Sequence, residues 1–192
     1  MELARPYTMR ARAASTESTR ERILNVAVAL LATRFRSEIR LGDVAAGAHV
    51  SVQTVLNVFG SRATLLDLAL DLWIAELRAQ RLRTEPGDTD GGLAALLDHY
   101  EKFGDLVIRN LAEQADPGLI EIGRSGHRQW VTRQFAPQLV DVSPARRRSL
   151  VDALVCACDV YTWKLLRRDM RRSRPDVEAT MRTIVQALLC VA

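Results

Sequence analysis

The stretch from Leu41 to Arg62 constrains the fold of this chain most strongly. It reads as two short helices joined by a tight turn at His49–Val50. Ser51 suits the N-cap of the second helix, because its hydroxyl can accept a hydrogen bond from a free backbone N–H. Gln53 and Asn57 are four residues apart, so they project from one side of that helix. Side-chain amides can pair with an adenine edge in the major groove. The pattern therefore predicts a helix-turn-helix.

The same stretch resembles the DNA-binding domain of the TetR family of one-component transcriptional regulators. The resemblance is carried by Val44, Ala45, Ala48, His49, Val50, Ser51, Thr54, Val55, Leu56, Phe59, Ser61, Arg62 and Leu65. It extends back through Ile23, Leu24, Ala27, Leu30 and Phe35. The segment DVYTWKLLRRDM (159–170) and the helix after it resemble the last two helices of many family members. Residues 84–150 show only generic helical sequence.

Three residues depart from the family pattern. His49 stands where the family has a turn glycine, a position that usually needs a positive φ angle. Leu56 and Val58 replace a tyrosine and a histidine that are typical of the family. Two backbone contacts to DNA that the family commonly makes are therefore missing. Arg62 keeps the positive charge of the family's lysine.

The location of the charged residues fits a polyanionic partner. The net charge of the 192 residues is +4. Residues 1–83 hold 12 basic and 8 acidic residues, whereas residues 84–192 hold 15 of each. All of the excess positive charge therefore lies in the half that carries the helix-turn-helix pattern, as expected for a DNA-binding protein.

The sequence argues against several other protein classes. No apolar run approaches the roughly 20 residues that cross a membrane, and the N-terminus has no apolar signal segment. We therefore expect a cytoplasmic protein. Its three cysteines, Cys156, Cys158 and Cys190, form neither a disulfide framework nor a metal motif, and we expect small buried residues there. With three histidines and no nucleophile or phosphate-loop motif, we expect neither an enzyme nor a cofactor or metal site.

Hydrophobic periodicity predicts an all-α fold of about nine helices and no strands. After a polar arm at residues 1–15, a capping box at Ser18 and Glu21 predicts the first helix start. Later helices are expected at about 62–83, 93–114, 119–135 with an interruption near Gly123–Gly126, 144–171 and from 175 onward. Pro, Gly and Asp make residues 84–92 the clearest turn segment. We assign residues 1–62 to the arm and DNA-binding domain, and residues 63–192 to a ligand-binding and dimerisation domain.

The resemblance and the residue types together suggest three sets of site residues. Candidate DNA contacts are Arg40, Ser51, Val52, Gln53, Thr54, Asn57 and Arg62. Candidate ligand-pocket residues are the polar and aromatic side chains His99, Tyr100, Phe103, Trp130, Tyr161 and Trp163. Candidate dimer-interface residues are Leu150, Leu154, Cys158, Leu165, Val177, Met181, Ile184 and Leu188.

The resemblance implies a repressor that binds a palindromic double-stranded DNA operator as a homodimer and is released by a small-molecule effector. The arginine-rich segment from Arg167 to Arg174 fits a solvated face better than a second DNA site, because Asp169 and Asp176 dilute its charge. The main alternative is a helical protein that binds a small molecule or a partner and whose DNA-binding head has degenerated.

Overall fold

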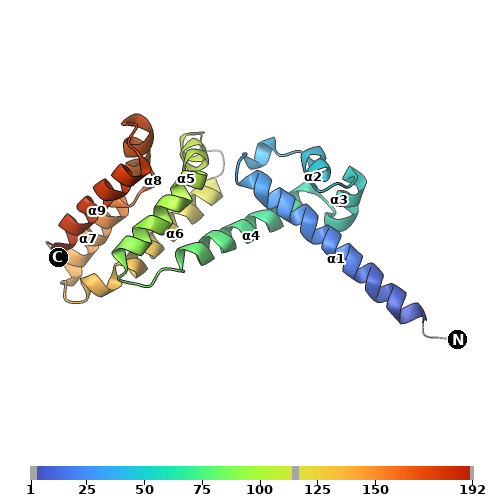
Figure 1. Ribbon diagram of the computed structural model, residues 1–192, viewed down its shortest axis with the longest axis horizontal. Helices are drawn as coiled ribbons and strands as arrows, with labels where there is room; N and C mark the ends of the chain where they lie inside the picture. Colours follow the sequence, from blue (N-terminus) through green and yellow to red (C-terminus); the bar gives the residue numbers. More distant parts are fainter. Residues whose placement is uncertain (1–3, 114–116, 191–192) are drawn as a thin grey trace. The chain divides into compact units, whose positions relative to one another are not determined.

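The computed structural model describes residues 4–113 and 117–190, and this part of the chain contains helices and no strand (Figure 1). The predicted all-α fold is therefore confirmed. The α-helices are α1 (Ala4–Leu31), α2 (Leu41–Gly47), α3 (Val52–Phe59), α4 (Arg62–Arg81), α5 (Thr89–Glu113), α6 (Pro117–Gln134), α7 (Pro144–Ala157), α8 (Val160–Lys164) and α9 (Arg174–Cys190). Short 3-10 turns cover Arg36–Glu38 and Ala136–Leu139, and a π-helical turn covers Leu165–Asp169. No helix in the described ranges is long and apolar enough to cross a membrane.

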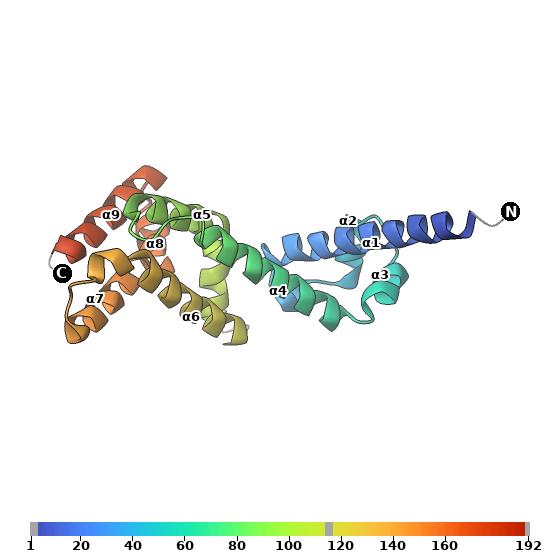
Figure 2. The same cartoon turned by 90° about the horizontal axis from the view of Figure 1, so that it is seen from below.

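The chain divides into two compact units, residues 1–76 and residues 77–192, which we call the head and the body. The division lies inside α4, which runs without a break in Figure 2. The sequence suggested a boundary after residue 62, where α4 begins. The first turns of α4 belong to the head because Leu65, Leu66 and Ala69 are completely buried in its core.

The core of the head is built from one apolar face of each of its helices. Ile23 and Ala27 of α1 pack with Val44 of α2 and Val55 of α3, and all four are 0% exposed. The first two helices approach closely, because a Cβ atom added at Gly47 would lie 2.8 Å from Cγ1 of Val26. The spacing of these apolar residues was readable from the sequence, as in any amphipathic helix.

Helix α1 begins earlier than predicted. It starts at Ala4, so Ser18 and Glu21 lie inside the helix and are exposed, and the predicted capping box is wrong. After Pro6 the segment contains neither proline nor glycine and is rich in Ala and Arg, which favour helix. Nothing in the sequence therefore stops the helix from extending backward, and Pro6 is tolerated in its first turn.

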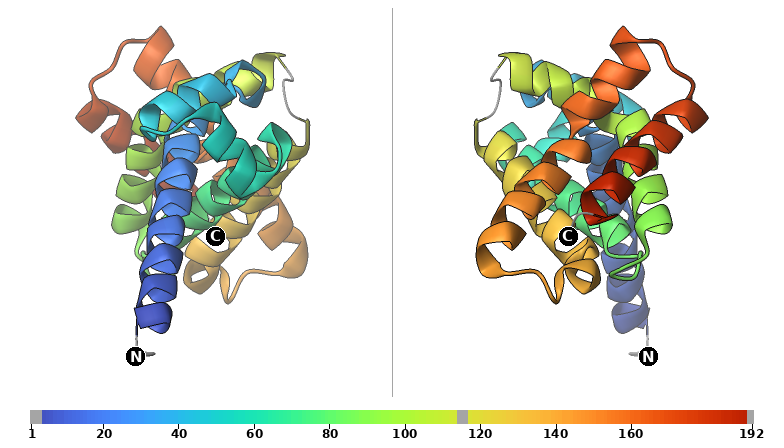
Figure 3. Two further views of the ribbon diagram at one scale, coloured as in Figure 1. Left: turned by 90° about the vertical axis from the view of Figure 1, so that its right-hand side faces the viewer. Right: turned by 90° about the vertical axis from the view of Figure 1, so that its left-hand side faces the viewer.

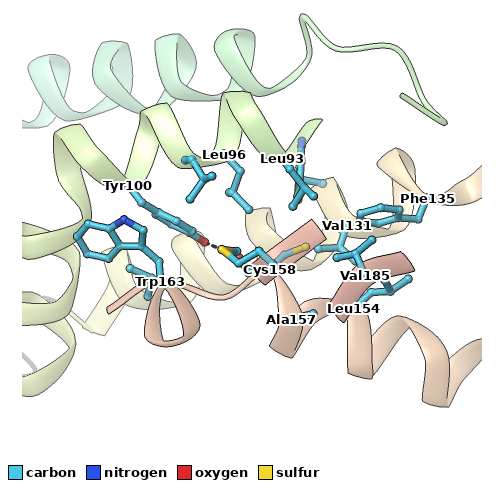
Figure 4. Packing of buried hydrophobic residues seen from close by; sticks show 14 of the residues in the cluster. Leu93, Leu96, Tyr100, Val131, Phe135, Leu154, Ala157, Cys158, Trp163 and Val185 are labelled. Carbon is cyan, nitrogen blue, oxygen red and sulfur yellow. Dashed lines mark hydrogen bonds between the residues drawn. The ribbon is translucent and has the colours of Figure 1, made fainter. Parts of the chain in front are cut away.

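The body is a helical bundle in which α9 packs against both α5 and α7 (Figure 3). Its core joins Leu93 and Leu96 of α5 to Leu154 of α7 and Val185 of α9 (Figure 4). The buried Tyr100 hydroxyl donates a 2.9 Å hydrogen bond to the carbonyl oxygen of Cys158. This bond satisfies the only polar atom of the Tyr100 side chain, as a buried hydroxyl requires.

The helix predicted over residues 144–171 is broken in the structure. Helix α7 ends at Ala157, and Asp159 is the N-cap of α8, with its carboxylate accepting a 2.9 Å hydrogen bond from the Tyr161 N–H. The hydroxyl of Thr162 donates to the carbonyl of Cys156, so the break is stabilised on both sides. Helix α6, by contrast, runs without the predicted interruption near Gly123–Gly126.

Burial corrects most of the predicted dimer-interface residues. Five of them lie in the core of the body with at most 7% exposure and cannot form an outer surface: Leu150, Leu154, Cys158, Val177 and Met181. Leu165 is 53% exposed, Ile184 is 38% exposed and Leu188 is half-buried. The last helices of the body carry apolar residues on both their buried and their exposed faces. The sequence alone therefore did not separate core residues from surface residues. The cysteine prediction holds only for Cys158, since Cys156 and Cys190 are exposed.

The connection between α4 and α5 is held by α6. The fully buried amide of Gln134 donates 2.8 Å hydrogen bonds to the carbonyls of Glu85 and Asp88, and it accepts a 3.0 Å bond from the Thr84 hydroxyl. The Gln138 amide donates to the carbonyl of Gly87 at 2.8 Å. The segment that the sequence marks as a turn is therefore tied to α6 and to the turn after it at several points.

Arginines after α8 pair with a row of carboxylates on α5. Arg168 and Asp105 form a bidentate pair with both distances at 2.9 Å, and Arg167 binds Glu101 at 2.8 Å. Burial alone would raise the pKa of Glu101, but hydrogen bonds from Arg167 and from the Trp163 indole outweigh it and lower the pKa. These pairs, with Arg174–Asp98 and Arg182–Asp90 on α9, explain the arginine-rich segment as part of the packing of the body.

Candidate nucleic-acid interface and ligand site

The turn of the helix-turn-helix has the backbone conformation that its sequence position requires. His49 has a φ angle of 54°, in the left-handed region. Its N–H bonds the carbonyl of Ala46 at 3.2 Å, and the N–H of Val50 bonds the carbonyl of Ala45 at 3.0 Å. These two bonds form a Schellman motif, which closes α2 with a left-handed residue that is usually glycine. The expectation of a positive φ angle at position 49 is confirmed.

We expect His49→Gly to stabilise the head by about 0.5–1 kcal/mol. Glycine removes the cost of about 1–2 kcal/mol that a side chain incurs in the left-handed region, and part of this gain is offset by the greater freedom of glycine in the unfolded chain. Chemical denaturation of the full chain measures the change. His49→Val is the matched control and should destabilise the head, because a β-branched residue fits this region poorly. Equal stability of all three proteins would contradict a strained turn.

Helix α3 is capped and oriented by its first residue and its apolar face. The Ser51 hydroxyl accepts a 3.0 Å hydrogen bond from the Thr54 N–H, as predicted for an N-cap. Val55 and Phe59 are buried in the head. The opposite face is therefore turned to solvent and presents Val52, which is 40% exposed, together with the exposed amides of Gln53 and Asn57.

The two exposed amides bond each other. Nε2 of Gln53 donates to Oδ1 of Asn57 at 2.9 Å. This bond fixes the relative orientation of the amides, and it leaves the Oε1 acceptor of Gln53 and the Nδ2 donor of Asn57 for other partners. An exposed hydrogen bond contributes little net stability, so it can be exchanged for bonds to base edges at small cost.

Arg62 is half-buried, and backbone carbonyls of the head hold its guanidinium. Its Nε donates a 2.7 Å hydrogen bond to the carbonyl of Ile39, and an Nη atom donates to the carbonyl of Arg36. The Arg36 guanidinium in turn pairs with Asp67 of α4 at 2.6 Å. Two arginines therefore fasten the connector before α2 to α4, and contact between Arg62 and a phosphate stays a prediction. Arg40 is exposed at the N-cap of α2, where its N–H bonds the carboxylate of Asp43.

Two arginines that contact the helix-turn-helix were not found from the sequence. Nε of Arg22 on α1 donates a 2.9 Å hydrogen bond to the carbonyl of Ala48, one residue before the turn. The guanidinium of Arg20 lies 5.3 Å from the centre of the Phe59 ring, a cation–π distance. From the sequence, these two arginines contributed only to the positive charge of the head. Their partners, Ala48 and Phe59, lie far away in the chain, so no local pattern predicted the contacts.

The six candidate ligand residues of the body do not share one site. The rings of Tyr100 and Phe103 lie 5.6 and 5.3 Å from that of His99 on α5. Trp163 is completely buried, and its indole N–H donates to Glu101 at 3.1 Å, so it is a core residue. Tyr161 is 54% exposed and lies outside the core.

Trp130 belongs to a buried polar cluster that the sequence did not reveal. Its ring stacks on that of His127, with 6.1 Å between the ring centres. Both side chains are at least 93% buried, as is His99. Burial, followed by the nearby charge of Arg81, lowers the pKa of His99 to about 3. The same causes lower the pKa of His127, although its hydrogen bond to Val155 opposes them. Both imidazoles are therefore neutral at pH 7.

Comparison with known proteins finds similarity to two transcriptional regulators. No protein-family model matches the chain. The chain is 24% identical over 144 residues to the HTH-type transcriptional repressor SCO4008 of Streptomyces coelicolor, covering 75% of this chain and 73% of the relative. Its fold is similar to the crystal structure of a TetR-family transcriptional regulator from the same organism. The TM-score is 0.71 at 19% identity, and the match covers 91% of this chain and 82% of that one.

Proposed function

This chain has the TetR-family fold, and we propose that it is a TetR-like one-component transcriptional regulator that acts as a repressor. The similarity to a curated transcriptional repressor and to a TetR-family structure supports the proposal. The resemblance of the sequence to this family agrees with both. The family is one of binding proteins, so we expect no catalytic activity.

The observation that carries the proposal is the exposed polar face of α3. The N-cap at Ser51 fixes the start of this helix, and the Schellman turn at His49 fixes its angle to α2. The amides of Gln53 and Asn57 then project from a helix whose other face is anchored in the core. A rigid helix with convergent amides is the arrangement that reads base edges in the major groove.

We further propose that the regulator is a homodimer that binds a palindromic operator. A dimer would present two α3 helices to half-sites about one helical turn, roughly 34–36 Å, apart. The exposed apolar side chains of Leu165 and Ile184, with the half-buried Leu188, support a contact surface on the last helices of the body. A small-molecule effector bound in the body would favour a state with lower operator affinity, which requires different effector affinities in the two states.

The test of this function is selection of bound duplexes from a random DNA pool by the purified full chain at two salt concentrations. We expect an enriched palindrome whose binding weakens as salt rises. Gln53→Ala and Asn57→Ala should each relax the preference at one position of each half-site. Each should cost about 1–3 kcal/mol of discrimination, because one amide–base contact is lost.

Gln186→Ala is the matched control, since Gln186 is an exposed amide on α9. It should leave the selected sequence unchanged. If the wild-type chain enriches no sequence and binds DNA only at low salt, the proposal that α3 reads base edges is wrong. The chain would then be a ligand-binding or partner-binding protein whose DNA-binding head has degenerated.

A further inference from the structure

Among the described residues of the body, four side-chain nitrogen atoms are buried and have no hydrogen-bond partner. They are Nε of Arg81, Nδ1 of His99, Nδ1 of His127 and Nε1 of Trp130. The side chains of the last three are at least 93% buried. A buried polar atom without a partner costs about 1–3 kcal/mol. Native proteins retain few such atoms without a functional reason.

The four groups belong to one region of the body. Arg81 ends α4, His99 lies on α5, and His127 and Trp130 lie on α6. The rings of His127 and Trp130 stack, with 6.1 Å between their centres. The charge of Arg81 lowers the pKa of both histidines, and that of His127 lowers the pKa of His99, so these side chains lie within electrostatic range of one another.

Arg81 also lacks the carboxylate partner that four other half-buried arginines of the body have. Arg167, Arg168, Arg174 and Arg182 each bind at least one carboxylate. Arg81 binds none among the described residues, and burial lowers the pKa of its guanidinium. A half-buried positive charge without a counter-charge is unfavourable, so the site favours an anionic ligand.

We propose that the body binds a small organic carboxylate at Arg81, with His99, His127 and Trp130 as its further polar partners. The ring of Phe103, 5.3 Å from that of His99, supplies an apolar and aromatic neighbour. Tyr100 does not take part through its hydroxyl, because that group is bonded to Cys158.

The histidine tautomer adds a second requirement on the ligand. Nε2 of His127 lies 3.2 Å from the carbonyl oxygen of Val155. A carbonyl can only accept, so Nε2 carries the proton, and Nδ1 of the neutral ring presents a lone pair. The indole N–H of Trp130 and the guanidinium can only donate. The ligand that satisfies all of these atoms is a carboxylate that also carries a hydroxyl.

This proposal rests on the proposed function, since it identifies the chemical class of the effector. Arg81 is the last residue of α4, and the first turns of the same helix lie in the core of the head. An anion held at Arg81 therefore acts directly on the helix that joins both units. The contact gives a route by which the ligand biases operator affinity.

The test is a ligand-observed NMR screen of the full chain, without DNA, against a library of matched aromatic carboxylates, carboxamides and amines, each with and without a hydroxyl. We expect carboxylates to be enriched among the binders, and hydroxylated ones to bind more tightly. Arg81→Gln should weaken carboxylate binding at least tenfold, as measured by calorimetry. Arg83→Gln, which changes an exposed arginine two residues later, should not.

A second variant separates ligand binding from folding. His99→Phe should keep or raise the melting temperature, because it removes an unpaired buried nitrogen, and it should still weaken carboxylate binding. Binders without preference for carboxylates, no binders at all, or unchanged affinity in Arg81→Gln would each overturn the proposal. Because no DNA is present, such a failure is independent of the operator selection, which tests the proposed function alone.

Discussion

Gln134→Ala should lower the free energy of unfolding by about 3 kcal/mol. The Gln134 side chain makes three hydrogen bonds to the segment after α4 and is completely buried. Its removal leaves the carbonyls of Glu85 and Asp88 without these donors, and each lost partner costs about 1–3 kcal/mol. Urea denaturation followed by circular dichroism at 222 nm measures the loss.

The matched control is Gln138→Ala, a truncation of the same side chain in the next turn. The Gln138 amide donates one short bond, to the carbonyl of Gly87 at 2.8 Å, and its Oε1 atom has no partner. We expect a loss of about 1 kcal/mol, the usual contribution of one hydrogen bond. If both substitutions cost the same, the network around Gln134 does not hold the segment as described.

Gly104→Ala should destabilise the body by about 1–3 kcal/mol, although alanine favours helix more than glycine does. A Cβ atom at position 104 of α5 would lie 2.4 Å from Cζ3 of the Trp163 ring. Trp163 is completely buried and is fixed by its hydrogen bond to Glu101, so it cannot move without further losses. Overpacking of this kind costs about 1–3 kcal/mol, beyond the gain of roughly 1 kcal/mol in helix propensity.

Gly123→Ala tests the same change where there is room. Gly123 is exposed on α6, and nothing lies within 4 Å of its added Cβ atom. This substitution should stabilise the protein by up to about 1 kcal/mol through helix propensity alone. Thermal melting of both variants should therefore show shifts of opposite sign. Two upward shifts would mean that the indole ring does not pack against position 104.

Local rules made much of the head predictable from sequence. The cap at Ser51, the positive φ angle at His49 and the burial of Val55 and Phe59 each depend on residues within a few positions of one another. Features that depend only on neighbouring residues can be predicted directly from the sequence. The projection of Gln53 and Asn57 from one side of α3 followed from their spacing alone, and their hydrogen bond agrees with it.

The body was less predictable because its decisive contacts join distant residues. Arg81 and His127 lie 46 positions apart, so no local pattern links them. The pairing of Arg168 with Asp105 and the hydrogen bond from Gln134 to Glu85 also join residues that are far apart in the sequence. The missed break at Asp159 is different, since aspartate is a common N-cap. The continuous apolar pattern on both sides of it hid that local signal.

The hydrogen bonds that Gln134 and Gln138 make to residues 84–88 have a mechanical consequence. A segment rich in proline, glycine and aspartate would ordinarily act as a loose joint that absorbs displacement. Here Gln134 and Gln138 fasten this segment, and with it the end of α4, to α6 and the turn after it. The joint is therefore stiff. A displacement of α6 is therefore transmitted to the end of α4 and is not absorbed by the connecting segment.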